Sequence, residues 1–120
     1  EFLIQSKSEI VKIPLNISFC NNNYINNTSS NCIFVDEDKL KFPLIIRKWT
    51  VGDLFFPFGM KGTKKVSKFF KDEKISNLEK NNTWILCSDN QIVWIIGMRM
   101  DDRFKVTNET KKILKLELNL

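Results

Sequence analysis

The 120-residue sequence contains no histidine, no alanine, only three cysteines and no long run of apolar residues. Without histidine, the chain lacks the most common metal ligand and the most common general base. Its scattered cysteines have no CxxC spacing, which indicates reduced thiols in a cytoplasmic protein rather than a disulfide framework or a zinc site. A cysteine nucleophile would normally need a histidine partner. We therefore expect neither catalysis nor a metal site in this chain.

Membrane-spanning and secretory segments are not expected either. A spanning helix needs about 18 to 20 predominantly apolar residues in a row, and no run in the sequence approaches that length. The sequence does not open on the charged and apolar pattern of a signal peptide. The prediction is a cytoplasmic protein with no membrane partner.

The composition favours strands over helices, because isoleucine, valine and phenylalanine are abundant and the best helix former is missing. Apolar and polar residues alternate over 11–19, which predicts a half-buried strand, and Pro14 places that strand at a sheet edge. An asparagine-rich loop is expected at 20–31. Further strands are expected at 32–35, 44–47, 83–88, 91–98 and 114–120, with Asp89-Asn90 as a hairpin turn. The predicted fold is mainly β (α+β), a compact β-sandwich or barrel-like domain with one or two short helices.

The net charge of +5 is unevenly distributed along the chain. Residues 47–74 hold eight basic and three acidic residues, which gives +5, whereas residues 1–46 sum to −1 and residues 75–120 to +1. A cationic cluster of this kind is typical of a polyanion-binding surface. A lysine-rich surface that serves only solubility would carry the same charge, so the alternative stays open.

One amphipathic helix is expected inside the basic stretch. With about 100° per residue, Val66, Phe69 and Phe70 fall on one side of such a helix. The opposite side carries Lys64, Lys68 and Lys71. The phenylalanines should face the core, and the lysines should project into solvent, where they can follow phosphates.

The segment 52–65 precedes this helix and combines three glycines, a proline and several phenylalanines with lysine. Glycines beside lysines would let a phosphate reach backbone N–H groups, although structural turns alone would also explain them. The GxxxxGK[ST] spacing of a nucleotide-binding P-loop is absent, so ATP binding is not expected here.

Two motifs in this part of the chain resemble a known family. They read RxWxxGDxFxPxGMxGxKKxSxFFxDxKI over 47–75 and IVWxxGxRxDxRFKVTxxT over 92–110. Their order and spacing closely resemble the C-terminal domain of bacterial tRNA(Ile)-lysidine synthetase. The resemblance covers about residues 39–118, so residues 39–120 are expected to form that tRNA-binding domain. Residues 1–38, with the edge strand and the asparagine-rich loop, are expected to be a connecting segment.

The resemblance implies a β-sandwich similar to a domain of the phenylalanyl-tRNA synthetase β chain. It also implies that the full-length protein is an ATP-dependent ligase, which joins lysine to the wobble cytidine of an isoleucine tRNA with a CAU anticodon. ATP with Mg²⁺, and lysine, would bind to an N-terminal catalytic domain whose SGGxDS loop is absent here. The C-terminal domain would hold the tRNA acceptor arm.

Phosphate contacts are expected from basic residues of the two motifs, namely Arg47, Lys61, Lys64, Lys65, Lys68, Arg99 and Arg103. Three of these residues have alternative roles. Arg99 and Arg103 could pair with Asp101 and Asp102, and Arg47 could stack on Trp49. The aromatic residues are expected mainly in the core rather than as base-stacking platforms, namely Trp49, Phe55, Phe56, Phe58, Trp84 and Trp94.

A second hypothesis is an oligomerisation or docking module with an incidental basic surface. In that case the apolar strands 11–19 and 113–120 would pair with a second copy, giving a homodimer, or with the enzyme's own catalytic domain.

Overall fold

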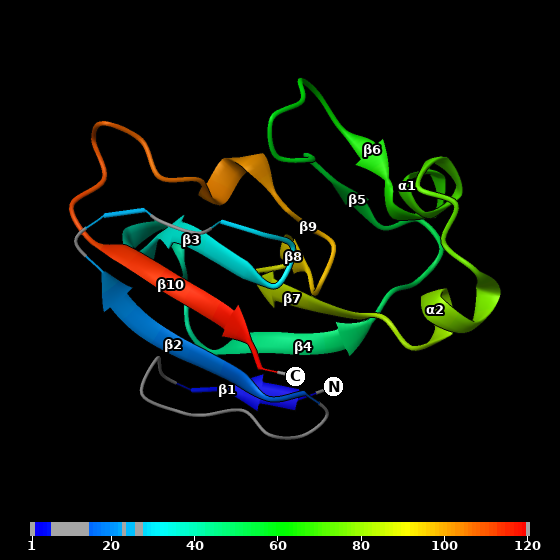
Figure 1. Cartoon of the computed structure of the whole chain (residues 1–120), viewed down its shortest axis with the longest axis horizontal. Helices are drawn as coiled ribbons and strands as arrows, with labels where there is room; N and C mark the ends of the chain where they lie inside the picture. Colours follow the sequence, from blue (N-terminus) through cyan, green and yellow to red (C-terminus); the bar gives the residue numbers. More distant parts are fainter. Residues whose placement is uncertain (1, 6–14, 23, 26–27, 120) are drawn as a thin grey trace.

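The computed structural model describes residues 2–5, 15–22, 24–25 and 28–119, and the described residues form two larger antiparallel sheets and one short ribbon (Figure 1). The five-stranded sheet has the order β1 (Phe2–Ile4), β4 (Leu44–Lys48), β7 (Trp84–Ser88), β8 (Gln91–Ile95) and β9 (Arg99–Met100). The three-stranded sheet has the order β2 (Ile17–Asn22), β10 (Ile113–Leu118) and β3 (Cys32–Asp36). The ribbon pairs β5 (Leu54–Phe55) with β6 (Lys64–Lys65).

The helical elements of the described chain are short. They are α1 (Val66–Asp72), α2 (Asn77–Asn81) and the single 3-10 turns η1 (Glu37–Lys39) and η2 (Asp102–Phe104). Ser76 caps α2 by accepting a hydrogen bond from the Glu79 N–H, and the Glu79 side chain accepts one from the Ser76 N–H in return. The predicted mainly β fold with short helices is confirmed.

The five-stranded sheet is the middle layer of the molecule, because apolar residues are buried on both of its faces. On one face, Leu44 and Trp94 pack against Ile33 and Leu116 of the three-stranded sheet. On the other face, residues of β7 and β8 pack under the ribbon and α1, in a second core of Phe55, Val66, Phe69, Phe70, Ile85, Cys87, Ile92 and Ile95. This double burial explains why β7 and β8 are almost continuously apolar instead of alternating.

The predicted hairpin turn between β7 and β8 is confirmed. Asp89 and Asn90 have φ angles of 49° and 64°, and two successive residues with positive φ are typical of the type I′ turn that matches strand twist. The predicted strand 91–98 ends at Ile95 instead, because Met98 N–H donates to the Ile95 carbonyl and the chain turns at Gly97 (φ 83°).

The described strands before residue 39 pair with strands of the domain expected at 39–120. β1 pairs with β4, and β2 and β3 pair with the two sides of β10. These segments therefore belong to the same two sheets as residues 39–119. The predicted strand 11–19 is described from Ile17, and it continues to Asn22 because β10 supplies backbone partners there; Pro14 lies outside the described residues.

The pairing of β10 also corrects the docking hypothesis in one respect. Every residue of β10 is paired with β2, and Ile113 to Glu117 are also paired with β3 on the other side. Its backbone N–H and C=O groups are therefore used within the chain, and this strand has no edge to offer to a second copy.

Candidate nucleic-acid interface

Helix α1 places its lysines on the surface by burying its apolar side. Val66, Phe69 and Phe70 are at most 3% exposed, and they pack against the second core. Lys68 and Lys71 are exposed on the other side. The predicted amphipathic helix is confirmed, and its buried phenylalanines fix the orientation of Lys68 and Lys71. Lys64, which was expected on the same side of the helix, lies before it in β6 and is half-buried.

The loop between β5 and β6, residues 56–63, is held in a defined path by η2. Asp101 is fully buried, and its Oδ2 accepts a hydrogen bond of 2.8 Å from the Phe56 N–H. Asp102 Oδ1 accepts one of 3.2 Å from the Gly59 N–H, and this bond, together with Lys105, lowers the pKa of Asp102 below its usual value. Two carboxylates therefore anchor the loop that carries Lys61.

Gly59 and Gly62 let this loop turn twice. Their φ angles are 83° and 80°, in the left-handed region, and a Cβ on either residue would meet no atom within 4 Å. The requirement for glycine is therefore one of backbone conformation rather than of space.

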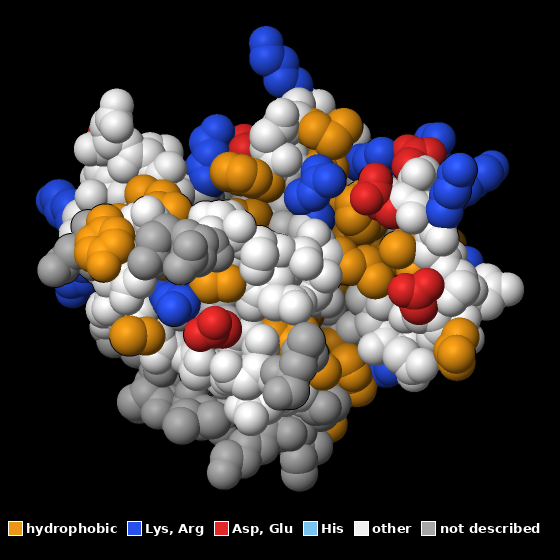
Figure 2. Space-filling view, viewed as in Figure 1, with side chains coloured by type: hydrophobic (Ala, Val, Ile, Leu, Met, Phe, Trp, Pro, Cys, Tyr) orange, Lys and Arg blue, Asp and Glu red, His pale blue; other side chains and the backbone are white. Residues whose placement is uncertain are grey.

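The loop and α1 together enclose an open groove of about 440 Å³. We call it the lysine groove; it is lined by Pro57, Met60, Lys61, Gly62, Thr63, Lys64, Lys65 and Lys68. Figure 2 shows Lys and Arg side chains gathered over this part of the molecule, around hydrophobic ones. The structure thus brings together four of the seven predicted site residues.

Asp72 pairs with two of these lysines from the C-terminal end of α1. Lys64 and Lys68 contact its two carboxylate oxygens, Lys68 at 2.8 Å. Their hydrogen bonds lower the pKa of Asp72 to about 2. No carboxylate of the described residues contacts Lys61 or Lys65, so these two ammonium groups are open to a ligand.

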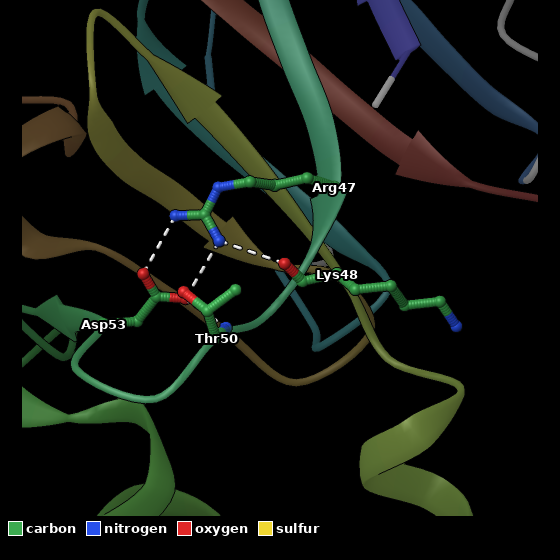
Figure 3. A network of polar contacts seen from close by, with 4 residues as sticks. All are labelled: Arg47, Lys48, Thr50 and Asp53. Atoms are coloured by element: carbon green, nitrogen blue, oxygen red, sulfur yellow. Dashed lines mark hydrogen bonds and ion pairs between the residues drawn. The ribbon is translucent and has the colours of Figure 1, made fainter.

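Arg47 lies outside the groove and has an internal partner (Figure 3). Its guanidinium donates two hydrogen bonds, of 2.9 and 3.0 Å, to Asp53 and one of 3.0 Å to the Lys48 carbonyl. The hydrogen bonds to Asp53 raise the pKa of Arg47. Burial alone would raise the pKa of Asp53, but the hydrogen bonds that its carboxylate accepts from Arg47 and from the Thr50 N–H have the larger effect. The pKa of Asp53 is therefore lowered. The predicted stacking on Trp49 is replaced by this clamp across the β4–β5 turn.

Arg99 and Arg103 have different environments. Arg103 donates hydrogen bonds of 3.0 Å from Nε and Nη2 to Asp101, and its guanidinium lies 4.4 Å from the ring centroid of Phe56. Arg99 instead lies over Phe69, 5.7 Å from the ring centroid, with Nη1 4.0 Å from Met60 Sδ. The ion-pair alternative is therefore realised for Arg103, whereas Arg99 lies beside the lysine groove.

The family is shown by sequence comparison. Residues 44–118 match the model of the family described as TilS substrate C-terminal domain. The chain belongs to this family. The matched range includes the whole lysine groove and both loop anchors, but it leaves out β1, β2 and β3.

The TilS relatives are much longer than this chain. It is 53% identical over 81 residues to a tRNA(Ile)-lysidine synthase of Parabacteroides distasonis, and these residues make up 68% of the chain and 18% of the relative. The corresponding protein of Bacteroides thetaiotaomicron is 44% identical over 79 residues, which cover 66% of the chain and 18% of that relative. The chain thus spans about a fifth of the length of these proteins.

The TilS likeness in three dimensions extends further along the chain than the family match. A crystal structure of a TilS C-terminal domain superposes with a TM-score of 0.74, at 21% identity, over 98% of this chain and 89% of the other. This likeness confirms the fold, including the sheets to which β1, β2 and β3 belong. Among the described residues, no helix has the length and apolar character required to cross a membrane.

Most of the aromatic residues expected in the core of this TilS domain pack there. Phe55 and Trp94 are fully buried, and Trp49 and Trp84 pack against the two cores. Phe56 and Phe58 are the exceptions: Phe56 is half-buried against the Arg103 guanidinium and belongs to neither core, and Phe58 has 42% of its surface exposed. The exposure of Phe58 could not be predicted from residue spacing, because it follows from the hydrogen bonds that fix the loop.

Proposed function

We propose that this domain binds and positions the acceptor arm of tRNA(Ile) in the cytoplasm, while the catalytic domain of the full-length ligase converts the wobble cytidine of the CAU anticodon to lysidine. The lysine groove carries this proposal. Its four lysines and the single carboxylate of Asp72 give a local charge of +3, whereas the whole chain has +5.

The chemistry of the groove suits a duplex RNA backbone. The acceptor stem is an A-form helix, whose major groove is too deep and narrow for side chains to read. Such a stem is bound through its phosphates and 2′-hydroxyls, and lysine is a mobile point charge that contacts phosphates without reading sequence. Lys61 and Lys65 are exposed and have no carboxylate partner among the described residues, so they suit this role best.

ATP with Mg²⁺ does not suit the lysine groove. Mg²⁺ prefers carboxylate and phosphate oxygens as ligands. The carboxylate beside the groove is Asp72, and both of its oxygens are held by ammonium groups. We therefore assign no step of the ligase reaction to this domain, and we expect ATP and lysine to bind to the catalytic domain.

Charge reversal at the groove tests the proposal. We expect Lys61→Glu/Lys65→Glu to weaken the binding of a tRNA(Ile) transcript by at least about tenfold at low salt, because two phosphate contacts become repulsive. The slope of log affinity against log salt should also become shallower by about 2. Filter binding or fluorescence anisotropy at several salt concentrations measures both quantities.

Lys111→Glu/Lys112→Glu is the matched control. These two exposed lysines lie in the loop that leads into β10, on the opposite side of Figure 1 from α1, and the double variant has the same net charge. It should keep an affinity close to that of the wild type. Equal losses in both double variants would show that only net charge matters, and the assignment of the groove would be wrong.

A further inference from the structure

Two smaller hollows lie near the lysine groove. The second hollow has about 190 Å³ and is lined in part by Phe58, Arg99 and Met100. The third has about 220 Å³ and is lined in part by Phe58, Met100 and Lys105. The second and third share Phe58 and Met100, and Arg99 of the second contacts Met60 of the lysine groove. The second and third hollows are therefore adjacent, and the Met60–Arg99 contact separates them from the lysine groove. We call the three hollows together the track.

Phe58 lines both of the smaller hollows, and hydrogen bonds of its backbone hold it there. Its N–H donates a 3.0 Å hydrogen bond to the Met100 carbonyl, and the neighbouring Pro57 forms a β-bridge with Asp101. The ring is nevertheless 42% exposed. A rigid backbone that presents a half-exposed aromatic ring next to two hollows is a preformed surface for a flat ligand.

Cations border the track along its length. Lys61 and Lys65 stand at one end, Arg99 in the middle and Lys105 at the other end. No carboxylate of the described residues contacts Arg99. Lys105 forms an ion pair with Asp102, with 3.1 Å between Nζ and Oδ2. Figure 2 shows Lys and Arg side chains alternating with hydrophobic ones over this part of the surface.

We propose that this track binds the unpaired 3′ strand of the acceptor arm, with a base stacked on Phe58 and the phosphates beside Lys65, Lys61 and Arg99. This inference rests on the proposed function. It adds the unpaired 3′ strand to the paired stem as a second part of the acceptor arm that the domain binds. Aromatic rings interleaved with cations are how proteins bind single-stranded RNA, since every base has a face to stack.

The size and lining of the two smaller hollows favour an unpaired strand over a further part of the paired stem. A paired stem offers phosphates and sugars outward but keeps its base faces stacked inside. Phe58, Met98 and Met100 supply apolar surface that phosphates would not use. An unpaired base has an apolar face that can cover such surface, and hollows of about 190 and 220 Å³ are too small for a two-stranded helix.

Two transcripts and three variants of the full chain test this inference. The transcripts are tRNA(Ile) with its complete 3′ end and the same tRNA without its unpaired 3′ nucleotides. The wild type should bind the complete transcript at least about fivefold more tightly, the gain expected from one stacked base. Phe58→Ala should remove this difference, and Phe58→Trp should keep it. Leu78→Ala removes another exposed apolar side chain, on α2 and outside the three hollows, and should leave the difference unchanged.

Four results would overturn the inference, and they point to three different errors. If the wild type binds both transcripts equally, or if Phe58→Ala weakens both equally, the track does not hold the 3′ strand, although the groove can still hold the stem. If Phe58→Ala binds both transcripts as the wild type does, the ring has no role. If the wild type binds neither transcript, the proposed function fails together with the inference.

Discussion

Acidic side chains determine which cations of this domain are open to RNA. Of the seven basic residues predicted to bind tRNA, four contact a carboxylate, namely Arg47, Lys64, Lys68 and Arg103. The partners of Arg47 and Arg103 are Asp53 and Asp101, so these arginines stabilise turns. Asp72 is different, because it pairs with two lysines of the groove and is itself at the surface.

Asp72→Asn should increase tRNA affinity. The substitution removes one negative charge from the groove and frees Lys64 and Lys68 for phosphates. Because exposed ion pairs are weak, we expect binding to become at most about fivefold tighter and its salt dependence to become steeper. Anisotropy titrations across a salt series measure both. With a pKa of about 2, the wild-type carboxylate is ionised at neutral pH, so the comparison does not depend on pH near neutrality.

Glu73→Gln is the control for the Asp72 substitution. It removes the same charge from the next residue, which is exposed. Its effect on affinity should be smaller, because no ammonium group of the groove contacts Glu73 among the described residues. Weaker binding by Asp72→Asn would instead mean that the carboxylate orients the two lysines for RNA.

Among the elements, those encoded by local pattern could be predicted, and those that depend on distant partners could not. The buried side of α1 and the Asp89-Asn90 turn follow from residue spacing and from turn chemistry alone. The two-residue strands β5 and β6 have no such pattern, since they exist through pairing with each other and through packing on the second core. For the same reason, the sequence did not show that Phe58 would be exposed.

Helix α1 depends on its phenylalanines, and a substitution there tests the second core. Phe70 is fully buried and packs edge-on against Trp49, with ring centroids 5.2 Å apart. We expect Phe70→Ala to lower the free energy of unfolding by about 3–5 kcal/mol, because it leaves a cavity under the helix. Lys71→Ala, on the exposed side of the same helix, should change it by less than about 0.5 kcal/mol. Urea unfolding measures both, and similar values for the two variants would contradict this packing.

At the scale of the whole molecule, structural similarity to the family covers more of the chain than sequence similarity does. The family match runs over residues 44–118, whereas the structural likeness covers 98% of the chain. The first three strands are therefore part of the same fold although they carry no recognisable motif. Strands need only apolar residues of the right period on their buried side, so their sequences can diverge while their positions persist.

Removal of residues 1–38 should therefore prevent stable folding of the rest. The truncation takes away both neighbours of β10 and the buried side chains of Ile17, Ile33 and Val35. It also exposes Leu114 and Leu116, which are fully buried in the intact chain. With about 1.5–3 kcal/mol for each of these five side chains, the loss is about 7–15 kcal/mol, as large as the whole stability of a typical domain. Near-ultraviolet circular dichroism of the tryptophans and thermal unfolding, with the intact chain as reference, should show no cooperative transition for residues 39–120. A cooperative transition at a similar temperature would mean that the second sheet is dispensable, and that residues 39–120 form a domain of their own.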